Sequence, residues 1–107
     1  MNAEEIRDYA LSKTGAEESF PFGNDTLVFK VKNKIFLLVS LDSSPLQFNV
    51  KCDPEKAVQL REEYPDYILP GYHMNKKHWN TNLTGNISKK LLTDMIDASY
   101  NLVAKIK

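Results

Sequence analysis

The chain has 107 residues, and its 14 lysines and arginines are balanced by 14 aspartates and glutamates, so its formal net charge is zero. That balance excludes a small domain that holds nucleic acid by an overall positive charge, since such domains usually have an isoelectric point above about 9. With 42% hydrophobic and 26% charged residues, the composition is that of a folded globular protein. The length predicts a single domain over residues 1–107.

The cysteine count and the N-terminus predict a cytoplasmic protein. Cys52 is alone, so the sequence lacks the disulfide framework that stabilises small secreted domains. The first residues are acidic and lead into no apolar stretch, which argues against a signal peptide. The longest apolar run, Ile35 to Val39, is far shorter than the roughly 20 residues that cross a bilayer. We therefore expect no membrane association.

The N-terminal half of the chain predicts one helix and three strands. Asn2 and Glu5 resemble a capping box, and apolar residues at helical spacing follow over about 3–13. A turn-rich segment over 19–25 leads to a change of period from helical to two. The alternation predicts strands at about 26–32, 35–41 and 46–52. Their connections are too short for crossovers, so we expect an antiparallel meander.

The next part of the chain predicts a second helix and two further strands. Asp53 and Pro54 are typical of a helix start, and Pro65 ends that helix. The following segment has few helix-forming residues, and we expect short strands at about 69–73 and 78–83.

A last helix completes the predicted fold. It is capped by Asn86 or Ser88, and its apolar residues recur at a spacing of three or four. The predicted order is therefore α-β-β-β-α-β-β-α. Because the strands are grouped, this order indicates an α+β fold in which an antiparallel sheet has flanking helices on one side.

The motifs of common enzymes are missing from the sequence. The four glycines form no phosphate-binding loop, and there is no nucleophile elbow. His73 and His78 are five residues apart, which suits neither a helical nor a strand metal site with Cys52. Cys52 itself ends an apolar strand face, where a thiol is usually a small buried hydrophobe. We therefore expect no catalytic site, no cofactor and no metal, and a protein that is not an enzyme.

The zero net charge conceals blocks of opposite sign. Residues 1–25 and 52–66 carry net charges of −4 and −3, whereas residues 26–51 and 67–93 carry +3 and +4. The basic blocks coincide with the predicted strands, so lysines on the sheet could form a local basic face opposite acidic helices. Lysines on an exposed sheet face also keep a protein soluble, and the charge pattern alone leaves both interpretations open. The lysines concerned are Lys30, Lys32 and Lys51, with Lys76, Lys77, Lys89 and Lys90 further along the chain.

The segment 70–81 is the densest in groups that recognise nucleic acid. Its lysines, Lys76 and Lys77, can neutralise phosphates, and aromatic rings such as Trp79 can stack on bases. The alternative is that Trp79 and Tyr72 face the core, which is common for the aromatic residues of a small domain.

The same segment, Pro70-Gly71-Tyr72-His73-Met74-Asn75-Lys76-Lys77-His78-Trp79-Asn80-Thr81, closely resembles the signature of the MmcQ/YjbR family. Pro21-Phe22-Gly23, Lys34-Ile35-Phe36, Lys51-Cys52-Asp53-Pro54-Glu55, Leu60-Arg61-Glu62 and Ser99-Tyr100 match in the same order. The resemblance implies a small α+β protein with the secretion-chaperone-like (YjbR-like) fold, commonly described as DNA-binding, without catalytic residues or cofactor. Asn33 stands where many relatives have glycine. The positions carried over as a binding surface are Lys51, His73, Asn75, Lys76, His78 and Trp79.

Our leading hypothesis is a non-catalytic domain that contacts DNA weakly through a basic sheet face and the neighbouring hairpin. Lys51, Lys76 and Lys77 would meet phosphates, while His73, Asn75, His78 and Trp79 would supply hydrogen bonds or stacking. The alternatives are a protein-interaction or chaperone-like adaptor, and a small-ligand site around Tyr72, His73, His78 and Trp79. We expect a monomer, although the sequence leaves the oligomeric state open.

Overall fold

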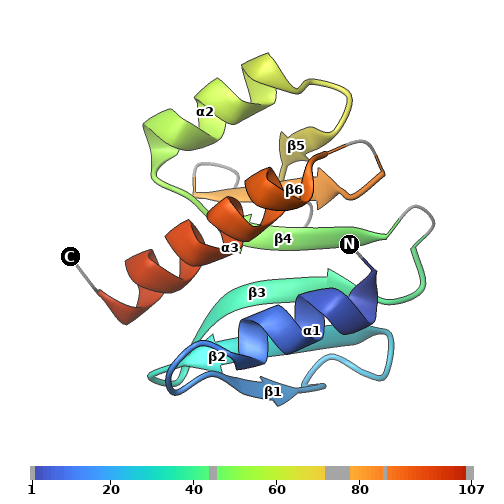
Figure 1. Cartoon of the computed structure of the whole chain (residues 1–107), viewed down its shortest axis with the longest axis vertical. Helices are drawn as coiled ribbons and strands as arrows, with labels where there is room; N and C mark the ends of the chain where they lie inside the picture. The colour runs from blue at the N-terminus through green and yellow to red at the C-terminus, as the bar shows by residue number, and fades with distance from the viewer. Residues whose placement is uncertain (1, 44–45, 72–77, 86, 106–107) are drawn as a thin grey trace.

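The computed structural model describes residues 2–43, 46–71, 78–85 and 87–105 and shows a six-stranded sheet with three helices (Figure 1). The elements are α1 (Ala3–Leu11), β1 (Glu17–Ser19), β2 (Thr26–Val31), β3 (Lys34–Ser40), β4 (Gln47–Lys51), α2 (Pro54–Glu63), β5 (Ile68–Pro70), β6 (Trp79–Leu83) and α3 (Lys89–Ala104). The predicted α+β class is confirmed, and the structure adds one strand, β1, to the five that the sequence predicts. None of the described helices is long and apolar enough to cross a membrane.

All pairs of neighbouring strands are antiparallel, in the order β1-β2-β3-β4-β6-β5. Strands β2, β3 and β4 form the predicted meander. The chain then leaves the sheet to form α2, and β6 returns beside β4 with β5 on its outer side. The basic strands of the sequence are thus the central strands of one sheet.

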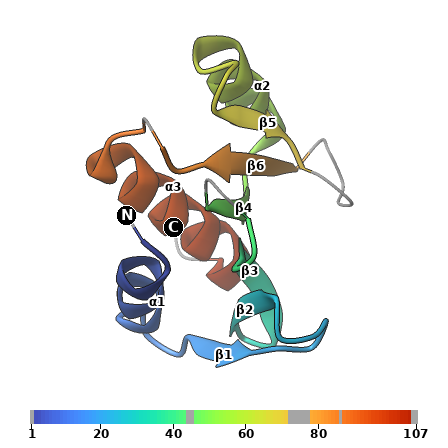
Figure 2. The ribbon, with the colours of Figure 1, turned by 90° about the vertical axis from the view of Figure 1, so that its right-hand side faces the viewer.

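The helices are distributed unequally over the two faces of this sheet. Figure 2 shows α1 and α3 on one face, whereas α2 lies at the β5 end of the sheet. Among the described residues no helix covers the opposite face, which we call the open face. The hydrophobic core lies between the sheet and α1 and α3, and its largest fully buried side chains include Ile6, Phe29, Phe36, Leu37, Phe48, Leu92 and Ile96.

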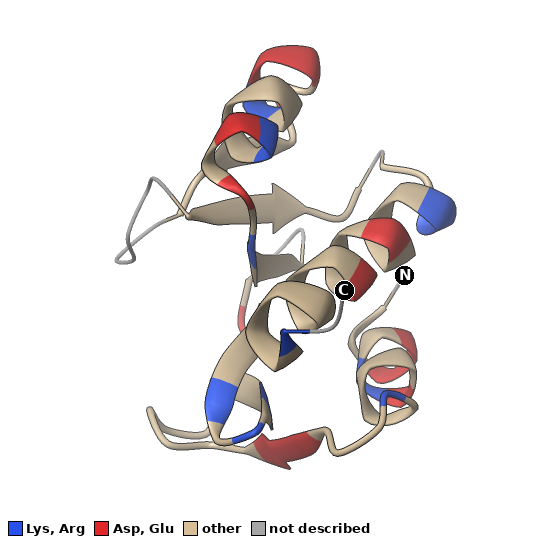
Figure 3. Cartoon of the chain, turned by 90° about the vertical axis from the view of Figure 1, so that its left-hand side faces the viewer, with Lys and Arg blue, Asp and Glu red and all other residues tan. Residues whose placement is uncertain are grey.

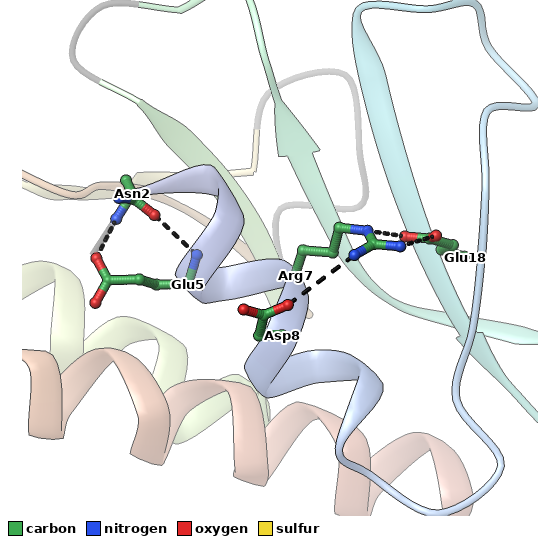
Figure 4. Close-up of polar contacts among 5 residues, drawn as sticks. All are labelled: Asn2, Glu5, Arg7, Asp8 and Glu18. Carbon is green, nitrogen blue, oxygen red and sulfur yellow. Dashed lines mark hydrogen bonds and ion pairs between the residues drawn. The ribbon is translucent and has the colours of Figure 1, made fainter.

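Helix α1 begins with the predicted capping box and is tied to β1 (Figure 4). The Glu5 N–H donates to Asn2 Oδ1 at 2.8 Å, and the Asn2 N–H donates to Glu5 Oε1 at 3.1 Å. Arg7 then donates two hydrogen bonds, of 2.7 and 2.6 Å, to the Glu18 carboxylate on β1. These bonds, together with the charge of Arg7, hold the pKa of Glu18 below its usual value.

Helix α3 is joined to the sheet by the hydroxyl of Ser99, which is fully buried. Ser99 Oγ accepts from the Lys51 N–H of β4 at 2.9 Å and donates to the Phe36 carbonyl of β3 at 2.5 Å. The direct pairing of β3 with β4 begins at Leu37 and Val50, one residue further in. The hydroxyl therefore replaces the last rung between these strands and connects their polar groups through the helix.

A β-bulge in β3 lies beside this bridge. The register between β2 and β3 shifts after Phe29, so that Phe36 is an extra residue on β3. Both Phe36 and Leu37 are fully buried in the core cluster, and the Phe36 ring meets Tyr100 edge-on at 5.4 Å. The bulge explains why two consecutive apolar residues of β3, Phe36 and Leu37, both face the core.

Strand β6 brings two asparagines into the core, which the sequence does not predict. Asn80 and Asn82 are fully buried. The Asn80 amide donates to the Ala57 carbonyl of α2 at 3.2 Å, and the Asn82 amide donates to the Phe48 carbonyl at 3.3 Å. These bonds attach α2 and β4 to β6 by polar contacts, where β2 and β3 use apolar packing.

Candidate nucleic-acid interface

The strand register determines which side chains lie on the open face. Residues that alternate with the buried Phe29, Leu37, Val50 and Asn80 point away from α1 and α3. On the described strands these are Glu17, Ser19, Thr26, Val28, Lys30, Ile35, Leu38, Ser40, Gln47, Asn49, Lys51, Leu69, Trp79, Thr81 and Leu83. The face mixes polar and amphipathic side chains with five aliphatic ones, Val28, Ile35, Leu38, Leu69 and Leu83.

Two lysines and the tryptophan meet at one end of the open face, which we call its basic end. Lys30 pairs with Ile35 across β2 and β3, and Lys51 pairs with Trp79 across β4 and β6. Both lysines are partly exposed. Because β2 and β4 are two strand spacings apart, the Lys30 and Lys51 backbones lie about 10 Å from each other. The structure thus brings together the predicted Lys51 and Trp79 and adds Lys30, which strand alternation also predicts on this face.

Trp79 lies at the surface of the sheet and is not part of the hydrophobic core cluster. Its side chain is half-buried on the open face beside Lys51. The Gly71 N–H donates to the Trp79 carbonyl at 2.8 Å, and a Cβ at Gly71 would lie only 2.8 Å from the Trp79 Cβ. The interpretation of Trp79 as a core residue is therefore wrong, and Gly71 holds the tryptophan backbone by a contact that only glycine allows.

The middle of the open face carries amide and hydroxyl groups. Asn49 pairs with Thr81, and its Oδ1 is buried without a hydrogen-bond partner. A shallow hollow of about 250 Å³ beside this pair is lined by Gln47, Leu69, Pro70 and Thr81. Amide side chains next to a small apolar hollow are the kind of surface on which an unpaired base can be held.

The end of the open face opposite the basic end carries exposed aromatic residues and an acidic residue. The loop between β1 and β2 projects toward this side of the sheet (Figure 2). It exposes Phe20 and Phe22, which are 47% and 67% exposed, close in sequence to Asp25. The Leu41 N–H donates to the Asp25 carbonyl at 2.8 Å and holds the loop against the end of β3. The strand residues at this end, Thr26, Ser40, Gln47 and Leu83, include no lysine, so we assign the candidate interface to the basic end.

Three lysines that the sequence groups with this face lie elsewhere. Lys32 is in the turn after β2, and its Nζ donates to the Ala104 carbonyl at the end of α3 at 2.8 Å. Lys89 and Lys90 lie at the start of α3 on the helical side, paired with Glu5 at 3.6 Å and Asp94 at 3.0 Å. The expectation that Lys32 shares the face with Lys30 and Lys51 is wrong, because the alternation of the strand ends at the turn.

The rest of the predicted hairpin site is only partly described. His73, Asn75, Lys76 and Lys77, with Tyr72, lie outside the described residues. His78 is half-buried, and its carbonyl accepts from the Cys52 N–H at 2.6 Å, which extends the pairing of β4 with β6 by one residue. The described cavities are not lined by His78 or Trp79, so the small-ligand site expected there gains no support from them.

The charges of the described residues separate the two sides of the molecule. Figure 3 shows acidic residues on α1, α2, α3 and β1. Strands β2 to β6 contain three lysines, Lys30, Lys34 and Lys51, and no acid. An anion approaching the open face therefore meets Lys30 and Lys51 on the central strands, although Glu17 of the edge strand β1 lies beside Lys30 on the same face.

Cys52 has the environment of a buried hydrophobe. It is 5% exposed, and burial raises the pKa of its thiol, although Lys56 and Arg61 act in the opposite direction. A thiol in this state is largely protonated at neutral pH and is a weak nucleophile. Among the described residues no three histidine, cysteine or carboxylate side chains are close enough together to hold a metal ion.

Comparison with known proteins supports the resemblance found in the sequence. The YjbR family model matches residues 11–102. The protein YbdF of Escherichia coli O157:H7 is 44% identical over 101 residues, which are 94% of this chain and 82% of YbdF. YjbR of Escherichia coli K12 is 32% identical over 94% of this chain and 85% of its own length.

Solved structures agree with the fold. The crystal structure of Deinococcus radiodurans protein DR2400, a DUF419 domain, has a TM-score of 0.92 and 38% identity, covering 98% of this chain and 80% of that one. A protein from Pseudomonas syringae has a TM-score of 0.82 and 28% identity, covering 96% and 99% of the two chains. Fold, sequence and signature thus agree, and the chain belongs to the YjbR family.

Proposed function

We propose that this chain is a non-catalytic, cytoplasmic domain that binds DNA weakly through the basic end of its open face, with a preference for single strands. The observation that carries the proposal is the convergence of Lys30, Lys51 and Trp79 on one helix-free face of the sheet. Lysines neutralise phosphates, and a partly exposed tryptophan offers a ring on which a base can stack.

The preference for single-stranded DNA follows from the difference between the helical side of the molecule and the open face of the sheet. Reading a duplex requires an element that enters a groove, most often a helix. The three described helices lie away from the open face and carry many of the acidic residues (Figure 3). A sheet face that carries Trp79, Asn49 and Gln47 instead suits splayed, unpaired bases.

Salt dependence gives the first test. Binding of a fluorescent 20-nucleotide single strand should weaken as salt rises, with a log–log slope of about −0.7 for each lysine that neutralises a phosphate. With Lys30 and Lys51 alone the slope is about −1.4, and it approaches about −2.8 if Lys76 and Lys77 also contribute. Fluorescence anisotropy between low and physiological salt measures this slope, and an absence of binding even at low salt would refute the proposal.

Matched lysine substitutions give the second part of the same test. Lys51→Gln should lower the affinity and make the slope less steep by about 0.7, because one phosphate contact is lost. Lys90→Gln, on the opposite side of the molecule, should leave both quantities unchanged. Trp79 is the single tryptophan of the chain, so base stacking should also quench its fluorescence. Equal losses in the two lysine variants would show that binding is not located on the open face.

A further inference from the structure

A cleft of about 430 Å³ lies between α2 and α3, away from the open face. Its apolar lining includes Cys52, Leu60 and Met95, which are each no more than 5% exposed, and Leu102, which is 44% exposed. The cleft therefore has a buried apolar base and reaches the surface beside Leu102. Its size and mostly apolar lining are those of a site for a small organic molecule.

The cleft exists because α3 has two apolar stripes and the fold covers only one of them. The stripe that contains Leu92 and Ile96 is buried against the sheet. Met95, Ala98 and Leu102 follow one another at a spacing of three and four residues and line the cleft. Helix α2 does not close over this second stripe, because it packs mainly on β5 and β6 at the end of the sheet.

The two helices run in opposite directions along the cleft, so its two ends differ. The Lys51 N–H donates to Ser99 Oγ at 2.9 Å, which places the start of α2 beside the last turns of α3. In Figure 1 the start of α2 and the end of α3 lie on the same side of the view. Lys56 of α2 and Asn101 of α3 therefore line the same end of the cleft, whereas Asp94 lies about 10 Å further along α3.

The two carboxylates of the lining already have partners. Asp94 forms an ion pair with Lys90 at 3.0 Å. The side chain of Asp53 caps α2 by accepting from the Glu55 N–H at 3.3 Å. A cationic ligand would have to compete with these contacts, so the carboxylates do not recommend one.

The ammonium group of Lys56 is in the opposite situation. It makes no hydrogen bond or ion pair with any residue that the structure describes. Burial raises the pKa of the nearby Cys52 thiol, and Lys56 and Arg61 each oppose that rise more strongly than Asp53 adds to it. The charges around this wall of the cleft therefore favour an anion.

We propose that the cleft between α2 and α3 binds a small monocarboxylate that has an aliphatic chain. The carboxylate pairs with the Lys56 ammonium, and the Asn101 amide can donate a further hydrogen bond. The chain extends along Met95 and Leu60 toward Leu91, where the lining is apolar. This site is separate from the candidate nucleic-acid interface and does not depend on the function proposed for it.

The test uses octanoate, decanoate and octylammonium below their micellar concentrations, with the folded full chain. Met95 lines the cleft, so its ¹³C-labelled methyl group, assigned through Met95→Leu, should shift saturably when octanoate is titrated in an NMR experiment. Decanoate should bind about tenfold more tightly than octanoate, because two further methylenes are buried. Octylammonium has a chain of similar length and the opposite charge, so it should bind several-fold more weakly than octanoate.

Two pairs of variants locate the binding. Lys56→Gln should weaken octanoate several-fold and leave the binding of neutral octan-1-ol unchanged. Lys34→Gln removes the same charge at an exposed position of β3 that does not line the cleft, and it should bind octanoate like the original chain. Ala98→Trp fills the cleft from an exposed position on α3 and should abolish the Met95 shift while the fold is kept. Gln59→Trp, at an exposed position of α2 outside the lining, should keep that shift.

Three results would each overturn the proposal. The first is a titration without saturation, and the second is an affinity for octylammonium that equals the affinity for octanoate. The third is equal behaviour of the two variants within either pair.

Discussion

At the scale of single residues, Ser99 has a role that no apolar residue could fill. Its hydroxyl satisfies a backbone donor on β4 and a backbone acceptor on β3, and it is fully buried. Water cannot replace it without opening the core. Ser99, one of the residues that match the family, is therefore needed to hold β3, β4 and α3 together. It does not belong to a binding surface.

We predict that Ser99→Ala lowers the free energy of unfolding by about 1–3 kcal/mol, because it leaves the Lys51 N–H and the Phe36 carbonyl buried and unpaired. Urea denaturation followed by circular dichroism measures the change. Thr93→Ala is the control, since Thr93 Oγ1 donates only to the Lys90 carbonyl of its own helix. If the two substitutions cost the same, the bridge contributes nothing specific to stability.

The residues of the candidate site were partly predictable for a simple reason. Period-two alternation correctly places Lys30 and Lys51 on one face, because a regular strand determines the direction of each side chain. It fails for Lys32, which follows the strand in a turn. It also cannot decide which face of β6 is buried, because Trp79 and Asn80 invert the usual rule that the aromatic residue is inside.

At the scale of elements, the turn between β2 and β3 depends on a rare backbone conformation. Lys32 and Asn33 have φ values of 51° and 65°, as the two central residues of a type I′ hairpin turn do. Asparagine tolerates this conformation, which explains how the chain forms a tight turn without glycine. The turn also brings the Lys32 ammonium to the last carbonyls of α3, where a positive charge is favourable.

We predict that Asn33→Ala destabilises the protein by about 1 kcal/mol, because alanine has a Cβ and no side-chain amide to offset the left-handed conformation. Asn33→Gly should keep the original stability or exceed it. Thermal unfolding of the two variants under identical conditions gives the comparison. Equal melting temperatures would mean that the turn relaxes to another conformation at little cost.

The helices and strands were predictable where the hydrophobic periodicity extends over many residues. The three helices and the meander carry clear caps and periods, and their bounds agree with the structure within a few residues. Strand β1 was missed because Glu17–Ser19 has no apolar alternation, and its pairing depends on contact with β2 and on the bond from Arg7.

At the scale of the whole molecule, α1 and α3 are joined by a group of ionisable side chains. The Tyr9 hydroxyl donates to Asp97 at 2.6 Å, and Lys13 forms an ion pair with the same carboxylate. Burial and the contact with Asp97 raise the pKa of Tyr9. Burial alone would lower the pKa of Lys13, but the hydrogen bond and charge of Asp97 raise it overall. The pKa of Cys52 is also raised, by burial.

These shifts predict that stability falls at alkaline pH. A group whose pKa is higher in the folded state holds its proton more tightly there, so its contribution is complete below the unfolded pKa and is lost as pH rises through the folded value. The loss should begin near pH 9, the ordinary pKa of a thiol, and should continue as Tyr9 and Lys13 titrate. Urea denaturation between pH 7 and 11 measures it. Tyr9→Phe should give a shallower decline, and an unchanged decline would contradict this assignment.

The outer strands of the sheet determine how the molecule behaves among its own copies. The two edges are β1 and β5, each three residues long. β1 carries Glu17 and Glu18, which repel an identical strand, and β5 ends in Pro70, which has no N–H to offer. Edge strands that are short, charged or closed by proline resist adding another chain to the sheet. The same fold that leaves one broad sheet face uncovered therefore protects its two margins against growth into fibrils.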